Sequence, residues 1–77
     1  MKGLAVGRII HYIGYNNNHH AAIITYVEDP EIGRITLTVF TNDPSNPTCV
    51  MNGIVFKSRA EDDNGGTPNT WHWVEFV

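Results

Sequence analysis

Apolar and polar residues alternate between positions 34 and 41, where Ile35, Leu37 and Val39 occupy every second position. Successive side chains of a β-strand point to opposite faces, so this period predicts a half-buried strand over Arg34–Thr41. The segment immediately before it, Asp29–Gly33, contains a proline and a glycine and is typical of a tight turn. We therefore predict a hairpin between this strand and the segment that precedes the turn.

Four further segments are rich in β-branched and aromatic residues and are separated by turn-forming residues. They predict strands over Val6–Tyr15, His20–Glu28, Val50–Ser58 and Thr70–Phe76. The polar segments 16–18, 42–48 and 60–69 contain the asparagine, proline and glycine residues that favour loops. In the first strand both alternating sets contain apolar residues, so the pattern leaves open which face is inward.

These elements predict an all-β fold, because no segment shows the apolar period of an ordinary helix. Five short strands in a chain of 77 residues favour a single domain over residues 1–77, a small, partly open, five-stranded antiparallel barrel of the SH3-like kind. An OB-like barrel is the alternative, although that fold normally contains a helix. In an SH3-like barrel the terminal strands are neighbours, which would place His11 and Tyr12 beside Trp71 and His72.

Composition and charge narrow the classes of partner. The net charge is −3 and the five basic residues are scattered, which argues against binding to a nucleic-acid polymer. The single cysteine, Cys49, excludes an intrachain disulfide framework and fits a reducing cytoplasm. No apolar segment is long enough for a signal peptide or a membrane span, so we expect a soluble protein without a membrane partner. A chain this small buries only about 60% of its unfolded surface, and we expect a homo-oligomer or a bound ligand to add stability.

The last predicted strand holds both tryptophans of the chain, and alternation places Trp71 and Trp73 on one face. An indole buries a large apolar area, so we expect at least one of the two in the core. The other, or Tyr12, would then offer a wall for stacking a purine-like ring, an interaction worth about 1–3 kcal/mol.

Histidines are the main candidates for polar chemistry. If the barrel closes as predicted, His11 and His72 are cross-strand neighbours, but two histidines without a third ligand do not make an ordinary metal site. His19 and His20 are adjacent, so in a strand they would point to opposite faces and would not share an ion. We interpret both as the end of a loop, with His20 the better contact for an anion, and predict neither a metal nor a cofactor.

Two further residues complete the expected ligand contacts. Arg8 shares a predicted strand face with Ile10 and Tyr12 and is the favoured phosphate contact, while Asn17 in the following turn would supply polar closure. The acidic segment 61–65 lacks the ligand spacing of a calcium loop. The sequence contains no glycine-rich phosphate loop, serine elbow or paired carboxylates, so it offers no sign of an enzyme.

Four segments, in order and at compatible spacing, resemble a family of small phage and prophage proteins. They are Val6–Tyr12, Ala21–Val27, Leu37–Phe40 and the closing run formed by Gly65–Thr67 and Thr70–Trp73. Family members typically end on Gly-Thr-Trp-His-Trp-Pro-Glu. Here Val74 replaces the proline, which favours a longer last strand, and Pro68 and Asn69 interrupt the run. The resemblance implies a phage accessory protein in the host cytoplasm, and small proteins of that kind often counter host defence.

We therefore expect a non-catalytic protein that binds and sequesters a small nucleotide-derived signalling molecule of host immunity. The expected binding residues are Arg8, His11, Tyr12, Asn17, His20, Trp71 and His72. One alternative is an SH3-like interaction module that masks a host protein by gripping it in an aromatic groove. A third interpretation is a small metal- or histidine-dependent hydrolase that uses His11 and His72.

Overall fold

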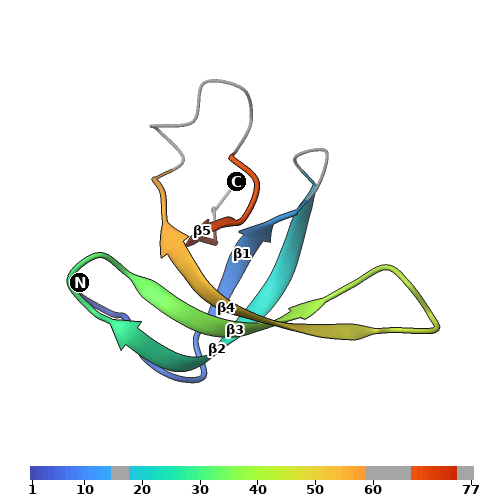
Figure 1. Cartoon of the computed structure of the whole chain (residues 1–77), viewed down its shortest axis with the longest axis horizontal. Helices are drawn as coiled ribbons and strands as arrows, with labels where there is room; N and C mark the ends of the chain where they lie inside the picture. The colour runs from blue at the N-terminus through green and yellow to red at the C-terminus, as the bar shows by residue number, and fades with distance from the viewer. Residues whose placement is uncertain (15–17, 59–66, 75–77) are drawn as a thin grey trace.

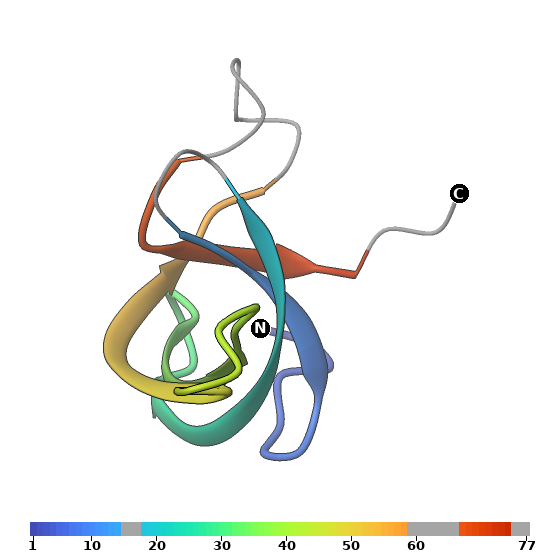
Figure 2. The same cartoon turned by 90° about the vertical axis from the view of Figure 1, so that its right-hand side faces the viewer.

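The computed structural model describes residues 1–14, 18–58 and 67–74, which contain five β-strands and no helix. The strands are β1 (Ile9–Ile13), β2 (His19–Asp29), β3 (Arg34–Phe40), β4 (Thr48–Phe56) and β5 (Thr70–Trp73). They pair in chain order, and β1 also pairs with β5, which closes a barrel (Figure 1). Figure 2 shows β2, β3 and β4 curling around a common interior. The prediction of a small, all-β, five-stranded barrel is confirmed.

The first strand is shorter than predicted. It begins at Ile9 instead of Val6, because the preceding residues turn the chain. Arg8 N donates to Ala5 O at 3.3 Å, and Gly7 has a φ of 94°, a conformation that glycine adopts without steric cost.

The described ranges contain no helix that would span a membrane.

The last two strands also differ from the prediction at their ends. β4 begins at Thr48 instead of Val50, in a long hairpin with β3 that projects beyond the barrel (Figure 1). β5 ends at Trp73 and does not include Val74, so the expected extension of the last strand is wrong at that residue. Residues 75–77 lie outside the described residues.

The barrel is closed and contains one parallel pair, whereas the sequence favoured a partly open antiparallel barrel. β4 and β5 run parallel, with Val55 opposite Thr70 and Phe56 opposite Trp71. The other four pairs are antiparallel. A parallel pair needs a connection of about a dozen or more residues to bring the chain back to the same end. The segment 57–69, between β4 and β5, has that length.

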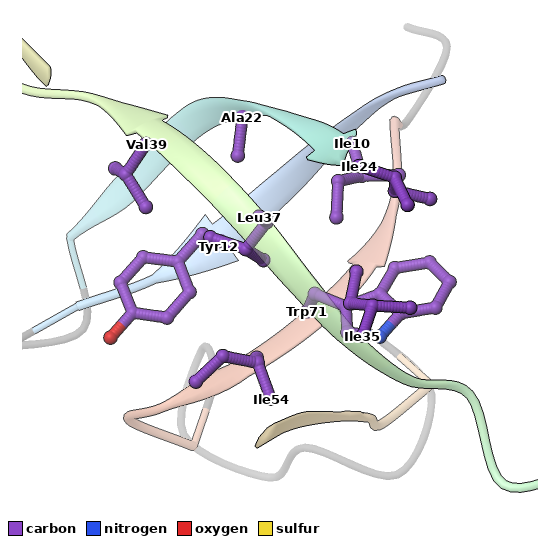
Figure 3. Packing of buried hydrophobic residues seen from close by; sticks show 9 residues of the cluster. All are labelled: Ile10, Tyr12, Ala22, Ile24, Ile35, Leu37, Val39, Ile54 and Trp71. Carbon is purple, nitrogen blue, oxygen red and sulfur yellow. The ribbon is translucent and has the colours of Figure 1, made fainter. Parts of the chain in front are cut away.

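Inward-facing side chains from all five strands form one core. Its members are Ile10, Tyr12, Ala22, Ile24, Ile35, Leu37, Val39, Ile54 and Trp71 (Figure 3). Ile10 is fully buried while Ile9 is 59% exposed, so β1 turns Ile10 and Tyr12 inward and settles the face that the sequence left open. Figure 3 places Trp71 at one end of this core and Tyr12 at the other.

Trp71 anchors the turn between β2 and β3. Its ring is fully buried, and Nε1 donates to the carbonyl oxygen of Gly33 at 2.7 Å, which satisfies the indole N–H. Phe56 and Trp73 pack edge-on against it, with ring centroids 4.9 and 5.0 Å away. The expectation that at least one tryptophan belongs to the core is confirmed.

Candidate functional site

A cavity of about 450 Å³ lies at the end of the core where Tyr12 is found. Its wall is formed by Tyr12, Gly14, Asn18, His20, Val39, Thr41, Cys49, Met51 and Asn69. Pockets for small organic ligands typically enclose roughly 300–1,000 Å³. The cavity is therefore large enough for one small molecule of about the size of a nucleoside.

Strand register brings the cavity residues together. Tyr12 lies opposite His20 in the β1–β2 pair, and Val39 lies opposite Cys49 in the β3–β4 pair. His20 is on the same face of β2 as Ala22, which belongs to the core, because alternate residues of a strand share a face. The cavity is thus the end of the core that the protein's own side chains leave unfilled.

Hydrogen bonds fix the polar side of the cavity. The Tyr12 hydroxyl donates to Asn69 Oδ1 at 2.6 Å, and Asn69 N donates to Ile13 O at 2.8 Å. Asn69 has a φ of 64°, in the left-handed region that asparagine tolerates better than most residues. β1 therefore holds both the phenol and the amide in position before any ligand enters.

The remaining wall combines apolar and hydrogen-bonding groups. Val39 and Met51 supply apolar surface, while His20 and Thr41 carry groups that donate or accept hydrogen bonds. Among the described residues, no lysine or arginine lines the cavity. This chemistry suits an uncharged ring that carries several hydrogen-bonding groups at its edge.

A second candidate site lies on the outer face of the barrel, where three histidines from different strands meet. They are His11 on β1, His19 on β2 and His72 on β5. His11 lies opposite His72 on β5 and opposite Ala21 on β2. His19 is two residues before Ala21, so it shares that face of β2. The ring centroids are 5.3 Å apart for His11 and His72, 5.9 Å for His11 and His19, and 5.1 Å for His19 and His72. One potential ligand nitrogen from each ring lies within 4.8 Å of the other two.

This histidine cluster is partly shielded from water. His72 is only 2% exposed, His11 is half-buried and His19 is exposed. Nδ1 of His11 is buried and has no hydrogen-bond partner among the described residues. A buried polar nitrogen in that state is costly, so the cluster favours a bound group that would satisfy it.

The predicted binding residues are divided between the two faces of the barrel wall. His11 and His72 are cross-strand neighbours as predicted, and they lie on the outer face. Tyr12 and His20 line the cavity on the inner face. Trp71 requires a correction, because its fully buried ring presents neither face to a ligand.

Arg8 does not join either group. The Arg8 guanidinium lies over the ring of Trp73, 5.1 Å from its centroid, in a cation–π contact worth about 0.5–1 kcal/mol at an exposed site. It is absent from the cavity wall, so the predicted phosphate contact is not positioned there. Asn17 lies outside the described residues.

Sequence reasoning missed His19 and the part of the cavity wall that Val39, Cys49 and Met51 form. His19 begins β2 instead of ending a loop, so its interpretation as a loop end is wrong. The register that places Tyr12 opposite His20 also places Ile13 opposite His19, which puts His19 on the same face as His11. The β1–β2 register would have revealed this meeting, but the sequence pattern alone does not fix it. Cys49 carried no comparable signal, because only pairing with β3 brings it to the cavity.

Comparison with protein-family models, with curated proteins and with solved structures gives no match. The two sites are therefore interpreted from their own geometry. Of the two, the cavity has the size and the lining of a small-molecule site, while the histidine cluster has the donor set of a metal site.

Proposed function

We propose that this protein binds a nucleotide-derived signalling molecule without catalysis, and that the cavity holds its nucleobase. The observation that carries the proposal is a cavity of about 450 Å³ with apolar walls and a polar side fixed by the Tyr12–Asn69 hydrogen bond. A nucleobase is flat, with apolar faces and hydrogen-bonding edges, so it matches both features. The resemblance to small phage proteins supports sequestration of a host immune signal as the purpose of binding.

The lining also indicates how such a molecule would lie. His20 and Thr41 are half-buried at the wall, where they would hydrogen-bond the edge of the base. Because no lysine or arginine of the described residues lines the cavity, we place the charged phosphates outside it, towards solvent.

Calorimetric titration with adenosine, guanosine and their cyclic nucleotides tests the proposal. We expect saturable binding of at least one of these compounds. His20→Ala should weaken that binding roughly two- to tenfold, the equivalent of one lost hydrogen bond of about 0.5–1.5 kcal/mol. Cys49→Trp should abolish it, because an indole at this wall position would occupy the space for the ligand.

Glu31→Ala is the matched control. Glu31 is exposed in the turn between β2 and β3, the turn that Trp71 anchors at the end of the core away from Tyr12. This variant should bind as the wild type does. The proposal is wrong if none of the compounds binds, or if Cys49→Trp binds as tightly as the unmodified chain.

The proposal includes self-association of the chain. Ile9, Ile23, Thr38 and Val50 lie opposite one another in successive strand pairs and form an uncharged row across the outer face. Ile9 and Val50 are 59% and 66% exposed. We assign this row to a second copy, because an uncharged row complements itself across a two-fold axis and a barrel this small gains stability by burying it. Native mass spectrometry of the same samples measures the mass, and a monomer at every concentration would contradict the assignment.

A further inference from the structure

We propose that His11, His19 and His72 form a binding site for Zn²⁺ on the outer face of the barrel. The three imidazoles come from the adjacent strands β2, β1 and β5, and one nitrogen from each lies within 4.8 Å of the other two. Imidazole nitrogen is a preferred ligand of zinc, and three histidines with one open position is an established zinc donor set. This site is separate from the cavity and does not depend on the function proposed for it.

The spacing of the rings matches that of imidazoles around one ion. Zinc binds imidazole nitrogen at about 2.0–2.1 Å, so tetrahedral geometry puts the centroids of its imidazole ligands about 5.2 Å apart. The distances in the cluster are 5.3 Å for His11 and His72 and 5.1 Å for His19 and His72. The third, between His11 and His19, is 5.9 Å. The rings therefore already stand at nearly the separation that coordination requires.

A small rotation of the rings completes the site. In a tetrahedral site the ligand nitrogens would lie about 3.3–3.4 Å apart. Here the three nitrogens are up to 4.8 Å from one another, so they have to move closer together. His72 is buried and His11 half-buried, whereas His19 is exposed. We assign most of the adjustment to His19, because packing restricts an exposed side chain least. The other two rings form the fixed side of the site.

A second observation points to a ligand at this place. Nδ1 of His11 is buried, and no described residue offers it a hydrogen bond. This nitrogen would be satisfied if it coordinated a metal ion through its lone pair. It would also be satisfied if it carried the proton and donated a hydrogen bond to an acceptor beside the metal. The outer face at this point thus contains a polar group that packing alone does not explain.

Zinc at this site would link three adjacent strands. His11 and His72 face each other across the β1–β5 pair that closes the barrel, and His19 extends the link to β2. Binding to the folded chain alone raises its stability by mass action. Three protein ligands would leave a fourth position for water or for an anionic group of a partner molecule.

The experiment uses the full chain, stripped of metal with a chelator and titrated with ZnCl₂ by calorimetry, with Co²⁺ absorption as a probe of tetrahedral coordination. We expect one Zn²⁺ per chain and a rise in melting temperature. His19→Ala should weaken zinc binding at least about tenfold, because it removes one of three ligands. This substitution is at an exposed position, so the variant should fold, and circular dichroism checks that it does.

His20→Ala is the control for zinc affinity. His20 is next to His19 in the sequence but faces the cavity. Its substitution therefore removes an imidazole from the chain without removing one of the three proposed zinc ligands. The inference is overturned if the wild type shows no saturable zinc binding, if His19→Ala binds zinc as tightly as the wild type, or if His20→Ala loses as much affinity as His19→Ala.

Discussion

Gly33 and Gly53 have nearly the same backbone conformation but very different surroundings. Their φ angles are 70° and 66°, in the left-handed region that glycine adopts without steric cost. A Cβ atom added to Gly33 would lie 2.7 Å from Phe56 Cβ and 2.9 Å from Met1 Cε. A Cβ atom added to Gly53 would meet nothing within 4 Å. A substitution at Gly53 therefore tests the cost of the backbone conformation alone, whereas one at Gly33 adds the cost of steric clashes.

Gly53→Ala should destabilise the protein by about 1–2 kcal/mol, the cost of a left-handed conformation for a residue with a Cβ. Gly33→Ala should cost distinctly more, because Phe56 Cβ is close to the backbone and has little freedom to move. The new methyl group would also lie 3.3 Å from the buried Trp71 ring. Urea unfolding followed by tryptophan fluorescence measures both changes. Equal losses in the two variants would show that the contacts around Gly33 relax without cost.

At the scale of elements, one carboxylate on β2 connects the next two strands. Glu28 Oε2 accepts hydrogen bonds from Thr36 Oγ1 on β3 and from Gly53 N on β4, both at 2.8 Å. Gly53 lies where the β3–β4 register shifts between the pair Leu37–Met51 and the pair Ile35–Ile54. The bond from Gly53 N, and then that from Thr36, lower the pKa of Glu28 below its ordinary value of 4.5. The carboxylate thus favours the folded barrel and holds the irregular part of β4.

A lowered pKa in the folded state means that Glu28 contributes stability when it is ionised. This contribution is fully present above pH 4.5 and is lost as the pH falls through the lower pKa of the folded protein. Glu28→Gln should therefore be less stable than the wild type at neutral pH, and the difference should shrink under acidic conditions. Urea unfolding at a series of pH values measures it.

Glu31→Gln serves as the control for the pH series. Glu31 is exposed, and its side chain makes no hydrogen bond to the described residues, so the substitution should leave the stability nearly unchanged across the same range. A gap between wild type and Glu28→Gln that stays constant down to the most acidic conditions would contradict a role for the ionised group.

How far the sequence predicts each element depends on how its two faces are covered. β3 has a buried set and a less buried set of residues, so alternation predicted its position and its inward face. In β1, Ile10 is buried on the inward face and Ile13 is fully buried on the opposite face. Both faces therefore carry buried apolar residues, and the sequence pattern does not reveal which face is inward. The parallel pairing of β4 and β5 depends on a long connection, which hydrophobic alternation does not describe.

The candidate sites depend on register, which the sequence pattern fixes only weakly. A slip of one residue between β1 and β2 would move His19 to the inner face and His20 to the outer face. The meeting of His11 and His72 was predictable, because it follows from barrel closure. The cavity was not predictable, because it depends on the volume that the core side chains leave at one end.

At the scale of the whole molecule, alternation separates the two candidate sites by the thickness of the barrel wall. Tyr12 and His20 face the cavity, while their neighbours His11 and His19 face outward. Cys49 lines the cavity from the start of β4, where it lies opposite Val39 of β3, whereas β4 pairs with β5, the strand of His72, at Val55 and Phe56. A change confined to the cavity should therefore leave the metal site intact.

The single cysteine allows this independence to be tested directly. Cys49 is exposed at the cavity wall, so N-ethylmaleimide should modify it and fill part of the cavity. The modified protein should lose nucleotide binding and keep the zinc affinity of the unmodified chain, both measured by calorimetric titration. Cys49→Ser treated with the same reagent is the control and should retain both. Loss of zinc affinity on modification would mean that the two faces are coupled through β1 and β2, whereas unchanged nucleotide binding would place the ligand outside the cavity.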